Sequence, residues 1–308
     1  MTTYDSGLLS LPDDIIYNIF SLLDTEALKS CSLTGQVLSC WAKPFVHRTL
    51  HLIPRPRITT SLNVPDHWNE LSGLPVLGER GLLQHTRHVS ILRTPLFAHD
   101  LRPHIRHLHA LTNLRSLSTR WLDTPAFNPV IEEYFGAFLE TLESLELVYA
   151  RGDHTQIFYF VCQFSDLRNL KIISVPGHTN SMNNNGPRFD IKVSPPLDGT
   201  LDLQLGMNTG PERDSMGAQR ILGALVTLPS GLKFRTLKLS GCVGDNLQSL
   251  IDACAPTLER MEFTWEWFGT SFLWGGRPLF IGFDYQAPSL VLGSASNGTP
   301  RSERLKSK

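Results

Sequence analysis

Residues 81–120 concentrate side chains that could bind an anion or a metal ion. The segment holds six arginines and six histidines, with Asp100 as its lone acid. Guanidinium groups bind phosphate and carboxylate oxygens well, so a basic face here could hold an acidic or phosphorylated substrate. His104 and His107, three apart on an expected helix, could ligate a metal. No cysteine joins them, so we expect ordinary exposed residues and keep both sites as alternatives. The residues are Arg87, Arg93, Arg102, Arg106, Arg115, Arg120, His85, His88, His99, His104, His107 and His109.

Sequence signatures of catalysis are missing from the chain. The five cysteines form no CxxC pair, which argues against structural zinc, and no P-loop, GxSxG, HExxH or Rossmann glycine motif occurs. A Cys–His nucleophile pair stays open, because such pairs meet only in the folded chain. The formal net charge of −1 makes the whole chain a poor polyanion binder. We therefore expect no catalytic residue, no cofactor, no metal and no nucleic-acid partner.

The elements that must position any site begin with a small helical module. Apolar residues spaced by one, three and four along 11–23 predict an amphipathic helix that starts at Pro12. Asp24 or Thr25 then caps a second helix carrying Leu28 and Cys31, and a third helix follows up to about Pro44. Three helices in some 40 residues bury little core, so a module of this size usually needs a partner surface.

The same residues resemble the F-box, as it occurs in many fungal proteins. That family docks on a Skp-type adaptor, which links it to a cullin–RING ubiquitin ligase. The resemblance therefore implies adaptor contact by the matching residues. It rests on Leu11-Pro12, Ile15-Ile16, Ile19-Phe20, Leu22-Leu23-Asp24 and the stretch Leu28 to Leu33. The implied adaptor-binding residues are Leu11, Pro12, Ile15, Ile16, Ile19, Phe20, Leu23, Leu28 and Cys31.

After residue 80 a short apolar pattern recurs: apolar, two residues, apolar, one residue, apolar. Its second apolar positions are separated by 28, 28, 25, 33, 34 and 24 residues, in or near the period of roughly 20–29 residues of leucine-rich repeats. Helical patterns lie between the copies, at 128–142, 154–164, 219–228 and 246–254. These second positions are Val89, Leu117, Leu145, Leu170, Leu203, Leu237 and Met261.

The alternation of strands and helices predicts an α/β fold with a parallel sheet and one helical layer. This body resembles a degenerate, irregular leucine-rich-repeat solenoid, and Cys242 stands at the ninth position of one copy, where Asn or Cys normally satisfies the turn backbone. A non-repeating α/β domain is the alternative. An F-box followed by such repeats is a familiar pairing.

In a solenoid, the residues between the apolar strand positions face the concave side. That row carries both signs of charge, which suits a protein surface better than a polyphosphate. The row is Ser90, Ser118, Glu146, Lys171, Gln204, Lys238 and Glu262. We predict substrate binding by Ser118, Glu146, Lys171, Lys238 and Glu262; a solvated strand face is the alternative.

The chain divides into five predicted stretches: flexible 1–7, F-box 8–50, Pro-rich linker 51–80, repeat domain 81–286 and disordered tail 287–308. A loop rich in Asn, Gly, Pro and Ser is expected over 176–199. The aromatic-rich segment 263–285 should seal the open end of the solenoid or serve as an interface hot spot.

Together these observations favour a two-part adaptor without catalytic residues. The module would bind a Skp-type adaptor and cullin, and the body a protein substrate whose identity the sequence does not give. A leucine-rich-repeat binding scaffold outside ubiquitination is the first alternative, and a hydrolase-like enzyme the second. The absence of an apolar run of 18 residues and the few scattered cysteines favour a cytoplasmic or nuclear protein with no membrane partner.

Overall fold

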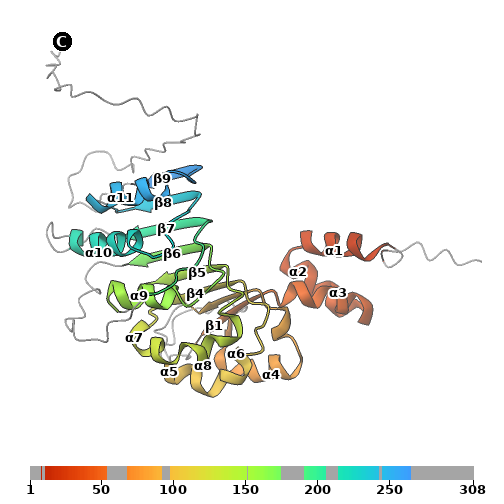
Figure 1. Ribbon diagram of the computed structural model, residues 1–308. Helices are drawn as coiled ribbons and strands as arrows, with labels where there is room; N and C mark the ends of the chain where they lie inside the picture. The colour runs from red at the N-terminus through yellow and green to blue at the C-terminus, as the bar shows by residue number, and fades with distance from the viewer. Residues whose placement is uncertain are drawn as a thin grey trace, which may run out of the picture.

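The computed structural model describes residues 8, 11–53, 68–91, 98–150, 152–174, 191–205, 214–242 and 245–264. Within these ranges the chain forms a three-helix module and an α/β body, which stand side by side (Figure 1). Each part has its own hydrophobic core. The described residues thus pack around two separate cores.

The module consists of α1 (Asp13–Leu22), α2 (Thr25–Thr34) and α3 (Gln36–Val46). α1 follows Pro12 and opens with two acids, whose charge favours the positive end of the helix dipole. The Asp24 carboxylate caps α2 by accepting a hydrogen bond from the Ala27 amide at 2.7 Å. Inside the module, α1 packs on α3 through Phe20 and Ala42.

The body is built on one sheet of nine strands, in which every neighbouring pair is parallel. From β3 onward the strands lie in chain order, and only β1 and β2 exchange places at the first edge. The predicted strands are thus confirmed as part of a single parallel sheet of an α/β body. The strands are β1 (Thr49–Ile53), β2 (Trp68–Glu70), β3 (His88–Ile91), β4 (Ser116–Arg120), β5 (Ser144–Val148), β6 (Asn169–Ser174), β7 (Thr200–Leu205), β8 (Thr236–Ser240) and β9 (Arg260–Thr264).

One apolar row runs across the sheet and forms the centre of its core. In register, Leu117, Leu145, Leu170, Leu201 and Leu237 lie on adjacent strands, all almost fully buried. Burial alternates along the strands, so one face is packed and the other is open. The packed face supports the sheet, and the open face is left for contacts outside the body.

The helices lie along one side of the sheet, as the predicted helical layer requires (Figure 1). In the C-terminal half of the body they are continuous α-helices of 8 to 13 residues. The expected helix over 128–142 is instead a series of short turns, whose aromatic rings fill the space above the sheet edge-to-face, as between Phe135 and Phe160 (5.6 Å). The α-helices are α4 (Leu74–Glu79), α5 (Ala98–Leu101), α6 (Ile105–Leu108), α7 (Thr124–Phe127), α8 (Ile131–Phe135), α9 (His154–Val161), α10 (Asp214–Val226) and α11 (Asp245–Cys254). The 3-10 turns are η2 (Leu71–Gly73), η3 (Leu83–His85), η4 (Arg102–His104), η5 (Asn128–Val130) and η6 (Gly136–Phe138).

The linker predicted over 51–80 needs correction, because the sheet already begins at Thr49. β2, η2 and α4 also fall inside that range. Pro75 lies in the first turn of α4, where a proline costs no hydrogen bond. Residues 54–67, with the other three linker prolines, lie outside the described residues, as do 1–7, most of the loop 176–199, all but Phe263 and Thr264 of the aromatic-rich segment, and the tail.

Candidate functional site

Exposed apolar side chains are concentrated on the helical module. Of the nine large hydrophobic residues that are exposed in the described part of the chain, seven lie before residue 40. Leu22 and Leu33 are the most open, with 86% and 87% of their surface accessible. Exposure of this density on a small unit marks an interaction surface. We call six of them the outer face of the module: Leu8, Leu11, Ile15, Leu22, Leu33 and Val37. The seventh, Tyr17, packs on Phe45 with ring centroids 4.9 Å apart and lines a cavity next to the body.

α1 carries two apolar stripes, and only one of them is open. Leu11, Ile15 and Leu22 are spaced by four and seven residues and point outward. Ile16 and Phe20 lie on the opposite stripe, buried in the core of the module. Apolar periodicity alone could not separate these stripes, because both follow the helical repeat.

Three of the nine predicted adaptor-binding residues therefore need correction. Ile16, Phe20 and Leu28 are at most 5% exposed and pack inside the module, so they stabilise it and do not offer a surface. Leu11, Pro12 and Ile15 are exposed as a docking role requires, whereas Ile19, Leu23 and Cys31 are half-buried at the border of the core.

The open face of the sheet carries a polar row across adjacent strands. In register, Ser118, Glu146, Lys171, Asp202, Lys238 and Glu262 follow one another. The prediction that Gln204 belongs to this row is wrong. Leu170 pairs with Leu201 and not with Leu203, so Asp202, two residues earlier, takes this position beside Lys171. Because leucines alternate at 201, 203 and 205, the sequence allowed β7 to pair with β6 through either Leu201 or Leu203. The longer segment between β6 and β7 breaks the regular repeat spacing, which would otherwise have distinguished the two registers.

The charges of this row neutralise one another. Lys171 Nζ lies 3.0 Å from Glu146 Oε1 and 3.8 Å from Asp202 Oδ2, and Lys238 Nζ lies 3.3 Å from Glu262 Oε2. Ser118 donates a hydrogen bond to Glu146 at 2.6 Å. Partial burial by itself would lower the pKa of Lys171, but the hydrogen bonds and charges of Glu146 and Asp202 outweigh it and raise this pKa. A partner that binds here must compete with these internal pairs.

A second group on the body escaped the sequence analysis. Trp121 and Tyr149 directly follow β4 and β5, with ring centroids 5.1 Å apart, and Arg120 Cζ lies 5.0 Å from the Tyr149 centroid. Val148 and Ile173 continue the row of Arg120 across the next two strands. We call these five residues the aromatic corner. Tryptophan, tyrosine and arginine are the residue types enriched at binding hot spots.

The backbone of the aromatic corner is held in a conformation that aromatic residues rarely adopt. φ is +59° at Trp121 and +56° at Tyr149, in the left-handed region. Each amide donates to the next strand, Trp121 to the Val148 carbonyl at 2.7 Å and Tyr149 to the Ile173 carbonyl at 2.6 Å. Such strain costs of order 1 kcal/mol per residue and clusters at functional sites. The 28-residue spacing of Trp121 and Tyr149, equal to that of the leucines, was the signal available in the sequence.

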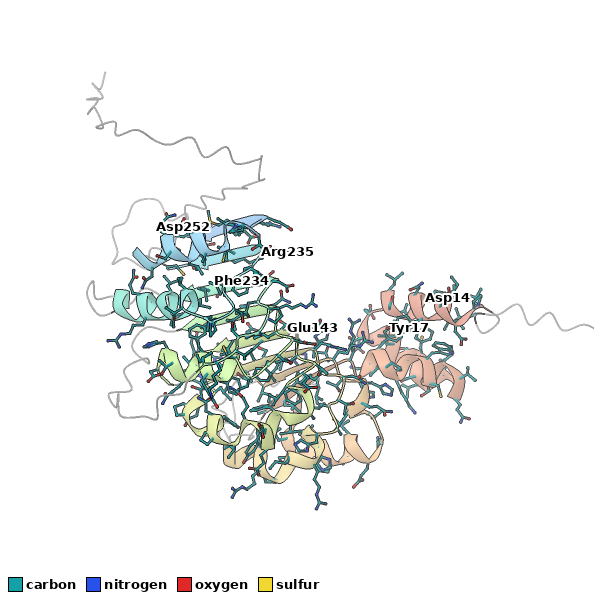
Figure 2. All side chains as sticks on the ribbon, in the orientation of Figure 1. Asp14, Tyr17, Glu143, Phe234, Arg235 and Asp252 are labelled. Carbon is teal, nitrogen blue, oxygen red and sulfur yellow. The ribbon has the colours of Figure 1, made fainter. Side chains whose placement is uncertain are left out.

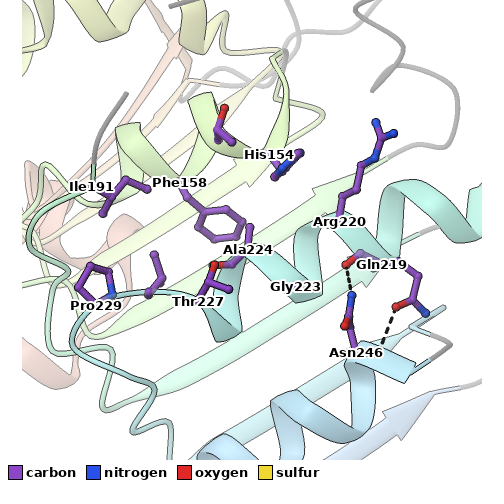
Figure 3. Close-up of a pocket in the computed structure, with 12 residues that line it drawn as sticks. His154, Phe158, Ile191, Gln219, Arg220, Gly223, Ala224, Thr227, Pro229 and Asn246 are labelled. Atoms are coloured by element: carbon purple, nitrogen blue, oxygen red, sulfur yellow. Dashed lines mark hydrogen bonds between the residues drawn. The ribbon is translucent and has the colours of Figure 1, made fainter. Parts of the chain in front are cut away.

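A groove of about 570 Å³ lies on the helical side, between α9 and α10 (Figure 3). The side chain of Asn246 donates to the Gln219 carbonyl at 2.7 Å and thereby joins α10 to α11. His154 is the only histidine among the lining residues given by the structure, and these include neither a carboxylate nor a thiol. These residues do not form a nucleophile–base pair.

The described cysteines of the body are buried or half-buried, and the described cysteines and histidines belong to no cluster of three metal ligands. Burial raises the pKa of Cys162 and Cys242 to about 12 and that of Cys254 to about 11, so these thiols stay protonated near neutral pH. No group of three potential metal ligands occurs within the described ranges. His104 and His107 are neighbours on η4 and α6, where burial and the charge of His107 lower the pKa of His104.

The arginines of 81–120 do not form one basic face. Arg115 pairs with Glu143 at 3.1 Å, and Arg120 stacks in the aromatic corner. Arg102 and Arg106 are exposed on the helical layer, and Arg93 lies outside the described residues. Of these arginines, only Arg87 lies close to the module, where it lines a cavity with Tyr17 and Phe45 in the described part of the chain.

No protein-family model matches the chain, and no curated protein matches it. Among the described helices, none is long and apolar enough to cross a membrane.

Proposed function

We propose that the chain is the substrate-recognition subunit of an SCF-type cullin–RING ubiquitin ligase. The observation that carries the proposal is the outer face of the module: six exposed apolar side chains on and beside three short helices whose sequence resembles an F-box. Covering such a surface with a partner is favourable, because each Å² of apolar area removed from water stabilises the complex by about 25 cal/mol.

In this proposal the Skp-type adaptor contacts the open stripe of α1 and the ends of α2 and α3. Leu11, Pro12 and Ile15 supply the first part of the contact, and Leu22 and Leu33 supply its most exposed part. Ile19, Leu23 and Cys31 border the same surface. Ile16, Phe20 and Leu28 hold the helices in place and act only indirectly.

We further propose that the body is a degenerate leucine-rich-repeat solenoid. From β3 onward its strands follow one another in chain order, and a leucine row runs in register from β4 to β8. Cys242 is fully buried, with Sγ 3.7 Å from the Ser240 carbonyl and 3.9 Å from that of Leu203. This contact agrees with the turn role expected at the ninth repeat position.

The open face of the sheet is the proposed site for a protein substrate. The aromatic corner offers apolar and π-surface, and the polar row offers both signs of charge beside it. Ser118, Glu146, Lys171, Lys238 and Glu262 stay in the proposed site, with Asp202 added and Gln204 moved to the neighbouring row. The chain would contribute proximity and orientation, and the ligase would contribute the chemistry.

Co-expression with a Skp-type adaptor and a cullin tests the proposal. The wild-type chain should co-elute with both proteins, and Ile15→Asp should abolish co-elution while the chain stays folded. Val76→Asp is the matched control, because Val76 is equally exposed but lies on α4 of the body. Co-elution that survives in Ile15→Asp would remove the outer face from the proposal. A wild-type chain that binds no adaptor would leave the alternative, a binding scaffold outside ubiquitination.

A further inference from the structure

A column of charged residues runs along the edge of the sheet where the strands begin. Each member precedes its strand and accepts backbone hydrogen bonds from the next member, as Arg48 does from Arg87 (2.8 Å) and Arg87 from Arg115 (2.8 Å). Glu143 and Arg235 of this column lie on the side of the body that faces the module (Figure 2). We call it the leading column; it contains Arg48, Arg87, Arg115, Glu143, Arg168, Gly199, Arg235 and Glu259.

Most arginines of the leading column have an acid beside them. Arg115 pairs with Glu143 at 3.1 Å, and Arg235 with Glu259 at 3.7 Å. Arg168 lies 4.0 Å from Asp198, the residue before Gly199. Adjacent positions of opposite charge stabilise a sheet, and adjacent like charges destabilise it.

Arg48 and Arg87 break this rule at the end of the column next to the module. They occupy neighbouring positions, and neither forms an ion pair within the described part of the chain. Their charges act on His88, where burial first and then Arg48 and Arg87 lower the pKa. Both residues are exposed to solvent, and two adjacent cations without a counter-charge attract an anion.

Both arginines line a small cavity between the module and the body. The cavity has a volume of about 170 Å³, and Tyr17 and Phe45 of the module form one wall of it. His85 and Asn113 form part of the opposite wall, on the body. No carboxylate is among the lining residues. The walls combine charged and neutral hydrogen-bond donors with an aromatic side.

The far side of α3 repeats the same electrostatic character. A cavity of about 410 Å³ there is lined by Lys43, His47 and Arg80, again without a carboxylate. Burial first, then the charges of His85 and Lys43, lower the pKa of His47. The two cavities beside α3 are thus both lined by cationic side chains, which attract anions.

We propose that the cavity at Arg48 and Arg87 binds a single phosphoryl group of a small phosphate-bearing ligand. The two guanidinium groups supply the charge-assisted hydrogen bonds. His85 can donate a further one, and so can the second N–H of the Asn113 amide, whose first N–H donates to the Gln84 carbonyl at 2.7 Å. The volume suits one phosphoryl group and not a polyphosphate chain. The proposal does not depend on the ligase function.

The site has a structural consequence, because its two walls belong to different parts of the molecule. α3 ends at Val46, and β1 begins at Thr49, so His47 and Arg48 form the whole connection. A bound phosphoryl group would join the walls and fix the orientation of the module relative to the body.

Titration with inorganic phosphate tests the proposal directly. Phosphate should raise the melting temperature of the full chain, whereas sodium chloride at the same ionic strength should not. The double variant Arg48→Gln, Arg87→Gln should lose this response, with phosphate binding weaker by roughly tenfold or more for each arginine, as expected of hydrogen bonds to charged groups. The matched control Arg115→Gln, Arg235→Gln removes two arginines from the same column and should keep the response.

A second readout separates ligand binding from a structural role. Without phosphate, the Arg48→Gln, Arg87→Gln variant should be at least as stable as wild type, because it relieves the repulsion of adjacent cations, whereas the control variant should be less stable. The proposal is overturned if phosphate stabilises the double variant as strongly as wild type, if chloride acts as well as phosphate, or if wild type does not respond. Loss of stability in the unliganded double variant would also contradict it.

Discussion

The outer face of the module and the open face of the sheet differ in how their side chains are satisfied. Leu22 and Leu33 project into solvent with no apolar neighbour to cover most of their surface. On the sheet, Lys171 already has Glu146 and Asp202 as partners. Binding of any complementary partner to the first surface is favourable, because it removes apolar side chains from water. A partner of the second surface must replace existing ion pairs with new contacts.

This difference suggests separate roles in recognition. An exposed apolar surface suits a permanent partner, because the free energy of apolar burial depends on the area covered and not on the directions of individual contacts. A self-neutralised polar row discriminates among partners, since a poorly matched one breaks its pairs without replacing them. Under the proposed function, the aromatic corner would supply the affinity that such a row lacks.

The largest expected effect separates core from surface within α1. Phe20→Ala should destabilise the module by about 3–5 kcal/mol, because it removes a fully buried ring from a small core. Leu22→Ala, two residues away and exposed, should change stability by less than about 0.5 kcal/mol. Urea unfolding, followed by hydrogen exchange in residues 13–46, measures both. Equal losses would contradict the assignment of the two stripes.

The aromatic corner is expected to show its strain in a pair of substitutions. Tyr149→Gly and Tyr149→Ala remove the same ring contacts, but only glycine adopts φ near +56° without cost. The glycine variant should therefore be more stable than the alanine variant by about 1 kcal/mol. The order of the two melting temperatures checks this. An alanine variant at least as stable would mean that the conformation is not strained.

The polar row should contribute little to stability, and less at high pH. Lys171→Met should cost no more than about 1 kcal/mol at pH 7, since the pair is partly exposed and screened. Folding raises the pKa of Lys171 above its ordinary value of 10.5, so its contribution is complete below that value and is lost as the pH rises through the folded pKa. Denaturant unfolding of wild type and variant at pH 7 and pH 11 should show the difference shrinking.

The thiols offer the finest comparison of the two parts. Cys40 of the module is exposed, whereas Cys162, Cys242 and Cys254 of the body are buried or half-buried with raised pKa values. Alkylation at pH 8 should modify Cys40 first and leave these three intact until the body unfolds. Mass spectrometry of the digested chain assigns the modified positions. Early modification of Cys242 would show that the body opens at that end.

The sequence predicts this fold well where a buried face repeats. A recurring apolar pattern with steps of 24 to 28 residues marks strands β3 to β6, β8 and β9, because one packed row must align across parallel strands. Around β7 the spacing changes, and the register of Leu201 could not be derived from an alternating strand. β1 was missed because the change of composition near residue 50 was interpreted as a domain boundary.

The candidate sites were less accessible to sequence reasoning for a related reason. Which stripe of α1 is open depends on where α3 packs, and periodicity holds no information on that contact. The unpaired state of Arg48 and Arg87 depends on a column that joins residues nearly 40 positions apart. The conformation of Trp121 follows from the turn after β4, not from a local preference of tryptophan.

Calorimetric titration of a Skp-type adaptor into the full chain tests the central claim most directly. The wild-type chain should bind the adaptor with a negative heat-capacity change, which is the mark of apolar burial. Binding should be lost in the double variant Leu22→Asp, Leu33→Asp and should persist in Val76→Asp. Unchanged affinity in the Leu22→Asp, Leu33→Asp variant, while its helices remain folded, would contradict the assignment of the outer face as the adaptor-binding surface.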